Sequence, residues 1–131
     1  MGQNEKTRAL LAAFGCALAY LLAGKALAAA LPQVPEEAAR MWAFVHRCAA
    51  APIVEELVFR GIIQQLARPL GERQAVALQA VLFAVQHRGP AGMAYALVCG
   101  LVLGTIRSRT GSVWPGMLLH TLNNLLVFAA G

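Results

Sequence analysis

The longest apolar run of the chain, over residues 9–31, constrains its fold more than any other feature. Only Lys25 interrupts this run, and Lys6 and Arg8 precede it. Because about 20 apolar residues suffice for an α-helix to cross the hydrocarbon core of a bilayer, we expect a transmembrane helix here. A cleaved signal peptide has a similar layout, but the rest of the chain is also apolar, which favours an uncleaved helix.

The composition indicates lipid as the solvent of the whole chain. Hydrophobic residues make up 59% of the 131 residues and charged residues only 13%, whereas soluble domains average about 25% charged residues. A chain this short cannot bury so much apolar surface in one aqueous core. The net charge of +5 comes from basic residues scattered between apolar runs. Such scatter is typical of loops beside lipid headgroups, so we expect no nucleic-acid binding.

Breaks in the apolar pattern predict four further helices. The predicted segments are residues 41–66, 74–87, 91–106 and 113–130. Pro52 is expected to kink the first of these segments, because a proline inside a helix removes one hydrogen bond and clashes with the preceding turn. Gly100 and Gly104 have the GxxxG spacing that permits close packing of two helices in a membrane.

Glu55, Glu56 and Arg60 lie in the middle of the 41–66 segment. Ionisable side chains inside membrane helices are costly and mark functional sites by default. Residues four apart share a helical face, so Glu56 is expected to pair with Arg60. Glu55 is left as the candidate general base. A purely structural ion pair would explain Glu56 and Arg60 but would leave Glu55 without a partner.

His120 and Asn124 also share one helical face, because they are four residues apart in the last segment. Both side chains can donate hydrogen bonds to a developing oxyanion, although hydrogen bonding between helices would use the same spacing. His87 ends its segment beside Arg88, where an interfacial histidine is the simplest interpretation. Glu55, His87 and His120 could also hold zinc, but an HExxH helix is absent from the sequence. The sequence leaves open whether a metal or Glu55 alone activates water.

Three motifs occur in a fixed order between residues 52 and 124. They read Glu55-Glu56-Leu57-Val58-Phe59-Arg60, Phe83-Ala84-Val85-Gln86-His87 and His120-Thr121-Leu122-Asn123-Asn124. In this order they resemble the motifs of the CPBP family of intramembrane proteases, which comprises CAAX prenyl proteases and bacteriocin-processing enzymes and is also called the Abi family. The chain is similar to the catalytic core of that family and resembles a minimal bacterial member.

The resemblance implies a role for each motif residue. Glu55 activates water, and His87 helps to hold that water. His120 and Asn124 stabilise the oxyanion, and Glu56 and Arg60 support the site. The glutamate mechanism is favoured, so no cofactor is expected, although zinc stays possible.

The predicted fold is therefore an all-α integral membrane protein, a four- to five-helix transmembrane bundle with an intramembrane catalytic cavity. Residues 1–131 form a single membrane domain. Within it, residues 1–50 provide an N-terminal transmembrane helix and an amphipathic connector, and residues 51–131 provide the catalytic core. The expected function is that of an endopeptidase acting on a membrane-embedded or membrane-anchored peptide. The alternatives are a non-catalytic immunity or scaffold protein that binds a partner's transmembrane segment, and a small transporter, for which no inverted repeat is visible.

The distribution of basic residues predicts the orientation in a bacterial inner membrane. With five spans, one side carries Lys6, Arg8, Arg68, Arg73, Arg107 and Arg109, and the other side carries Lys25, Arg40, Arg47 and Arg88. Because positive charge marks the cytoplasmic side, this bias favours a cytoplasmic N-terminus, with His87 near the outer surface. A CAAX substrate is cut on the cytosolic side, so we expect a sorting tail or a small exported peptide instead.

Overall fold

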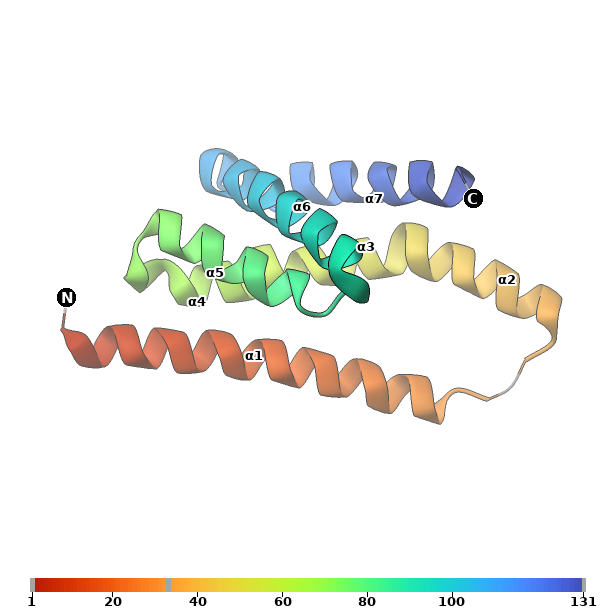
Figure 1. Ribbon diagram of the computed structural model, residues 1–131, viewed down its shortest axis with the longest axis horizontal. Helices are drawn as coiled ribbons and strands as arrows, with labels where there is room; N and C mark the ends of the chain where they lie inside the picture. The colour runs from red at the N-terminus through yellow and green to blue at the C-terminus, as the bar shows by residue number, and fades with distance from the viewer. Residues whose placement is uncertain (1, 33, 131) are drawn as a thin grey trace.

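The computed structural model describes residues 2–32 and 34–130, and within them every regular element is a helix (Figure 1). In chain order the elements are α1 (Gln3–Ala30), α2 (Glu36–Val45), η1 (His46–Ala50), α3 (Ala51–Glu55), η2 (Glu56–Ile63), α4 (Gln64–Ala67), η3 (Arg68–Leu70), α5 (Glu72–Ala84), α6 (Gly89–Thr110) and α7 (Trp114–Ala129). The predicted all-α fold is confirmed for these residues.

The elements from α2 to α4 follow one another without a break and form one long rod. Two parts of this rod, η1 and η2, are π-helical. In η1 the backbone N–H of Ala51 donates to the carbonyl of His46, five residues back. The next residue, Pro52, has no N–H to donate, so the carbonyl of Arg47 has no partner within the helix. A π turn directly before Pro52 thus accommodates this proline, for which the sequence predicts a kink.

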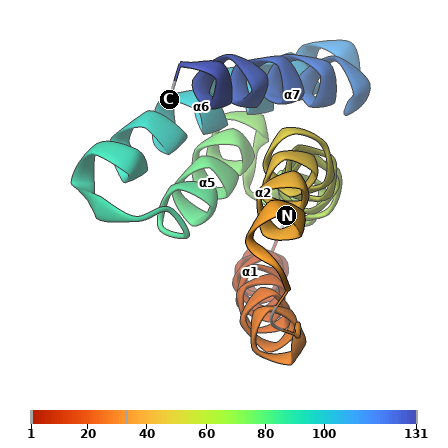
Figure 2. The ribbon, with the colours of Figure 1, turned by 90° about the vertical axis from the view of Figure 1, so that its right-hand side faces the viewer.

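The rod lies between α1 on one side and α5, α6 and α7 on the other (Figures 1 and 2). α1 contacts the rod through a stripe of small residues, because Ala9, Ala13 and Ala17 recur every four residues and are buried. The hydrophobic core where α1, the rod, α5 and α6 meet contains Ala13, Ala17, Phe59, Ile63, Leu82, Phe83, Ala84 and Ala96. This core holds the middle of the rod, which carries the two glutamates.

α5 and α6 pack closely at the predicted glycines. A Cβ atom added to Gly100 would lie 2.9 Å from the Cα atom of Ala80, a distance that real Cβ contacts do not reach. Two buried glutamines, one on α5 and one on α4, add hydrogen bonds to the backbone of α6. Gln79 donates to the carbonyl of Gly100 over 2.7 Å, and Gln64 donates to the carbonyl of Gly104 over 3.0 Å. The expectation of close packing at Gly100 and Gly104 is confirmed.

α1 and α6 are long and apolar enough to cross a membrane. Many large apolar side chains face outward, and Leu118 is 71% exposed. Such exposure is costly in water and expected in lipid. The number of spans in the bundle stays a prediction.

Several helix ends differ from the predicted ones by a few residues. α1 begins at Gln3 rather than at residue 9, and α6 extends over Gly89–Thr110 rather than over 91–106. α5 ends at Ala84, so His87 lies in the turn after the helix and not at the end of the helix itself.

Candidate active site

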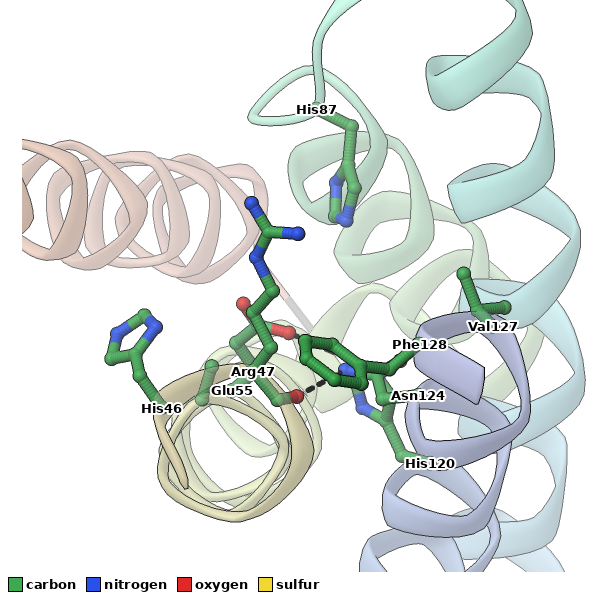
Figure 3. Close-up of a pocket in the computed structure, with 9 residues that line it drawn as sticks. His46, Arg47, Glu55, His87, His120, Asn124, Val127 and Phe128 are labelled. Atoms are coloured by element: carbon green, nitrogen blue, oxygen red, sulfur yellow. Dashed lines mark hydrogen bonds and ion pairs between the residues drawn. The ribbon is translucent and has the colours of Figure 1, made fainter. Parts of the chain in front are cut away.

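A hollow of about 780 Å³ brings together four of the six predicted site residues (Figure 3). Its lining consists of His46, Arg47, Ala51, Glu55, His87, His120, Asn124, Val127 and Phe128. The rod supplies Glu55, the turn after α5 supplies His87, and α7 supplies His120 and Asn124. Glu56 and Arg60, the other two predicted residues, are not part of this lining and are fully buried beside it.

Glu56 and Arg60 form the ion pair that their spacing predicts. The Nη1 atom of Arg60 lies 3.0 Å from Oε1 of Glu56, and both side chains are 0% exposed. The guanidinium carbon of Arg60 also lies 4.5 Å from the centre of the Phe83 ring, within the range of a cation–π contact. Because a buried charge is costly without a partner, the two groups depend on each other in this position.

His120 bridges the two glutamates. Its Nδ1 atom lies 3.0 Å from Oε1 of Glu56, and its Nε2 atom lies 3.6 Å from Oε2 of Glu55. Since the Glu56 carboxylate accepts hydrogen bonds, Nδ1 carries a hydrogen, and Nε2 carries one only when the ring is an imidazolium. With His120 charged, the two carboxylates face two cations, Arg60 and His120, and the buried cluster is neutral.

His87 is held by the backbone of its own motif. Its Nδ1 atom lies 3.0 Å from the carbonyl oxygen of Phe83. A carbonyl oxygen only accepts, so Nδ1 donates and Nε2 of the neutral ring is left as an acceptor. The ring points into the hollow (Figure 3). Nε2 of His87 can therefore accept a hydrogen bond from a water molecule inside the hollow.

Asn124 connects α7 to the π turn of the rod. Its Nδ2 atom donates over 2.8 Å to the carbonyl of Arg47, the group that η1 and Pro52 leave without a helical partner. Its Oδ1 atom accepts from Asn123 over 3.4 Å, and Tyr95 donates to Asn123 from α6. One amide hydrogen of Asn124 thus fixes the rod, and the second is available for another acceptor.

Phe83, the first residue of the middle motif, is the packing centre of the site. Its ring lies 4.7 Å from the His87 ring, 5.8 Å from the His120 ring and 5.1 Å from the Phe59 ring, measured between centroids. Edge-to-face contacts at these separations are favourable. The sequence alone indicates no role for Phe83, although the Phe-x-x-x-His motif contains it.

Gly116, in the first turn of α7, leaves the space that the Glu56 carboxylate occupies. A Cβ atom at this position would lie 2.7 Å from Oε2 of Glu56. The carboxylate cannot move away easily, because Arg60 and His120 hold its other oxygen. None of the three sequence motifs indicates that position 116 requires a glycine.

We expect Gly116→Ala to lower the cleavage rate about tenfold and to destabilise the protein by about 1–3 kcal/mol, since overpacking displaces the carboxylate that holds His120. The rate is measured in liposomes and the stability by thermal unfolding in detergent. The control is Gly92→Ala in α6, where an added Cβ meets no heavy atom within 4 Å. Equal rates in both variants would show that the Glu56 carboxylate needs no such space.

Metal binding requires ligands that converge on one point. Among residues 2–32 and 34–130, no group of three or more His, Cys, Asp or Glu side chains is placed to hold a metal ion. The possible zinc ligands Glu55, His87 and His120 line one hollow without forming such a group.

The family model for type II CAAX prenyl endopeptidases (Rce1-like) matches residues 37–126. The chain belongs to this family. The match contains all three motifs and most of the lining of the hollow. Members of this family are membrane-embedded proteases, which agrees with the two helices that are long and apolar enough to span a bilayer. Comparisons with curated proteins and with solved structures gave no match.

Proposed function

We propose that this Rce1-like protein is an intramembrane endopeptidase in which Glu55 activates a water molecule for attack on a peptide bond. The observation that carries this proposal is the position of Glu55. It lines the hollow, its Oε2 atom lies 3.6 Å from Nε2 of His120, and His87 faces the same space. A carboxylate and an imidazole acceptor in one cavity are suited to hold and deprotonate water.

The reaction begins when the Glu55 carboxylate takes a proton from water that also donates to Nε2 of His87. The resulting hydroxide adds to the carbonyl carbon of the substrate, and the carbonyl oxygen becomes an oxyanion. The imidazolium of His120 and the second amide hydrogen of Asn124 donate to this oxyanion. Donors fixed in advance are effective for this purpose because they need no reorganisation as the charge develops. Glu55 then returns its proton to the leaving amine.

Glu56 and Arg60 take no direct part in this reaction. They position His120, since Oε1 of Glu56 accepts from Nδ1 of His120 while Arg60 balances the carboxylate charge. Rigid support of this kind is required for a site to keep its productive geometry.

The expected orientation favours a substrate whose scissile bond lies at the outer face of a bacterial inner membrane. The N-terminus, the connection between α4 and α5 and the connection between α6 and α7 lie toward one end of the bundle, and the C-terminus lies toward the other (Figure 1). The first end carries the larger group of basic residues, which favours the cytoplasm. The hollow contains Val127 and Phe128 from the C-terminal part of α7 and lies toward the opposite end. The substrate class would then be a membrane-anchored peptide or tail cut near the outer surface.

Purified protein in liposomes, incubated with fluorogenic peptides that carry transmembrane anchors, tests this function. We expect the wild-type protein to cut at least one peptide at a single bond, which mass spectrometry of the products identifies. A non-catalytic scaffold would bind an anchored peptide and release no product. Stable binding of such peptides without any product would contradict the protease function.

A further inference from the structure

A second, much smaller hollow lies toward the end of the bundle opposite to the catalytic one, where the α4–α5 and α6–α7 connections meet (Figure 1). The centre of a water-sized molecule can move within about 10 Å³ of it, so it admits only a very small molecule or ion. It shares no lining residue with the catalytic hollow. The lining of this arginine hollow includes Arg60, Arg68, Arg107, Gln64, Glu72 and Ser108.

Arg60 reaches the arginine hollow from the ion pair beside the catalytic site. Its side chain is fully buried, and its Nη1 atom lies 3.0 Å from Oε1 of Glu56. Its Nε and Nη2 atoms have no hydrogen-bond partner among residues 2–32 and 34–130. Buried donors in folded proteins nearly always have a partner, which can be an ordered water or an ion. The free hydrogens of Arg60 therefore indicate that the hollow is occupied in solution.

Arg107 brings a second cation to the same hollow. It lies in the last turn of α6 and is partly buried. Its Nε atom is buried without a hydrogen-bond partner in the described part of the chain, and none of the ion pairs found there includes Arg107. Glu72, the carboxylate of the lining, is already used, because Arg68 lies 3.4 Å from its Oε2 atom and Ser108 donates to its Oε1 atom.

The charges at the arginine hollow do not balance. Its described lining contains three arginines and one glutamate, and Glu56 offsets one more positive charge through Arg60, which leaves one positive charge in excess. Two guanidinium groups beside one small hollow repel each other unless an anion lies between them. Oε1 of Gln64 also has no partner, but it would lie 3.3 Å from a Cβ atom added to Gly104 and thus faces the contact with α6. A water molecule could accept from the arginines but would not balance the charge.

We propose that the arginine hollow binds a small monovalent anion such as chloride between Arg60 and Arg107. The anion accepts the free hydrogens of both guanidinium groups, which are good anion donors. Glu56, Arg60, the anion and Arg107 then form a row of alternating charges. Because Glu56 also accepts from Nδ1 of His120 over 3.0 Å, the anion helps to position the catalytic histidine from the opposite end of the bundle. Anion binding stands independently of the protease function, whereas the effect on the cleavage rate rests on that function.

Thermal unfolding in detergent tests the binding. The wild-type protein is measured in sodium chloride, sodium bromide and sodium gluconate at equal ionic strength, since gluconate is too large for the hollow. A ligand that binds only the folded state raises the unfolding temperature, and we expect chloride and bromide to raise it by about 5 °C over gluconate. The rise should saturate as chloride replaces gluconate. Equal unfolding temperatures in all three salts would overturn the proposal and leave water as the occupant.

Arg107→Gln removes one of the two cations and should abolish the difference between chloride and gluconate. Arg109→Gln is the matched control, because Arg109 is an exposed arginine of the same helical turn outside the arginine hollow. It should keep the full difference. A chloride effect that persists in Arg107→Gln would place the anion elsewhere and overturn the assignment.

Crystals of the wild-type protein grown in sodium bromide provide a test that needs no variant. Anomalous scattering should show a bromide ion between Arg60 and Arg107, and an empty or water-filled hollow there would overturn the proposal. This experiment decides the question even if Arg107→Gln does not fold.

The cleavage rate tests the link to the catalytic site. At a temperature well below unfolding, we expect the rate in gluconate to be about threefold lower than in chloride, because a small displacement of a catalytic group is enough to slow a reaction. A change in unfolding temperature with equal rates would overturn the positioning of His120 by the anion. Absence of cleavage in every salt would contradict the protease function, whereas the unfolding and diffraction experiments would still test anion binding.

Discussion

Glu55→Gln is expected to reduce peptide cleavage about a thousandfold, the middle of the range for loss of a general base. Glutamine has nearly the same shape as glutamate but cannot take a proton from water. It keeps a polar side chain of the same length facing Nε2 of His120, which lies 3.6 Å from Oε2 of Glu55, so the fold should be retained. The measurement is the initial rate of cleavage in liposomes, with thermal unfolding as a check on folding.

Glu37→Gln is the matched control for this substitution. Glu37 is an exposed residue in the first turn of α2 and lines none of the hollows described. Its replacement should leave the rate within a factor of two of wild type. If Glu55→Gln cleaves as fast as Glu37→Gln, then Glu55 is not the base, and another group activates the water.

Glu56→Gln is expected to destabilise the protein by about 3 kcal/mol, because it leaves the buried Arg60 without its charge partner. Both side chains are 0% exposed, and their charged atoms lie 3.0 Å apart. Thermal unfolding in detergent measures this loss, and the cleavage rate should fall with it, since His120 also loses the carboxylate that its Nδ1 atom faces.

The double variant Glu56→Gln with Arg60→Met separates the two effects. Removing both charges should recover most of the stability, because replacing a buried pair by groups of similar volume is often tolerated. The cleavage rate should stay at least tenfold below wild type, since no carboxylate then accepts from Nδ1 of His120 and fixes its ring. Recovery of both stability and rate would show that the pair serves folding alone.

Much of the fold was predictable from the sequence because it follows from local pattern. The apolar run over residues 9–31 predicted α1, and the GxxxG spacing of Gly100 and Gly104 predicted a close approach of another helix to α6; both are present, and the other helix is α5. The spacing of Glu56 and Arg60 predicted their ion pair for the same reason, since residues four apart share a helical face.

Contacts between segments that lie far apart in the sequence were harder to predict from the sequence. Nothing in the local pattern of Gly116 indicates that the Glu56 carboxylate lies against it. The hydrogen bond from Asn124 to the carbonyl of Arg47 depends on a π turn, which hydrophobic periodicity does not reveal. Gln64 and Gln79 were visible as polar residues in apolar helices, but the rule that singled out the glutamates concerns ionisable side chains and does not cover an amide.

Four of the six predicted site residues converge on one hollow. Glu55, His87, His120 and Asn124 line it, and Glu56 and Arg60 lie buried beside it. Their chemical roles stay predictions. Phe83 was missed because an aromatic residue carries no catalytic signal of its own, and only the packing around it reveals its position.

The cleavage rate of wild-type protein with and without a strong zinc chelator tests the central claim, activation of water by Glu55 without a metal. Prolonged incubation with the chelator, followed by assay in liposomes with and without added Zn²⁺, distinguishes the two mechanisms. Our account predicts the same rate under all three conditions. Loss of activity in the chelator and its recovery on adding Zn²⁺ would contradict that account and would make Glu55, His87 and His120 metal ligands.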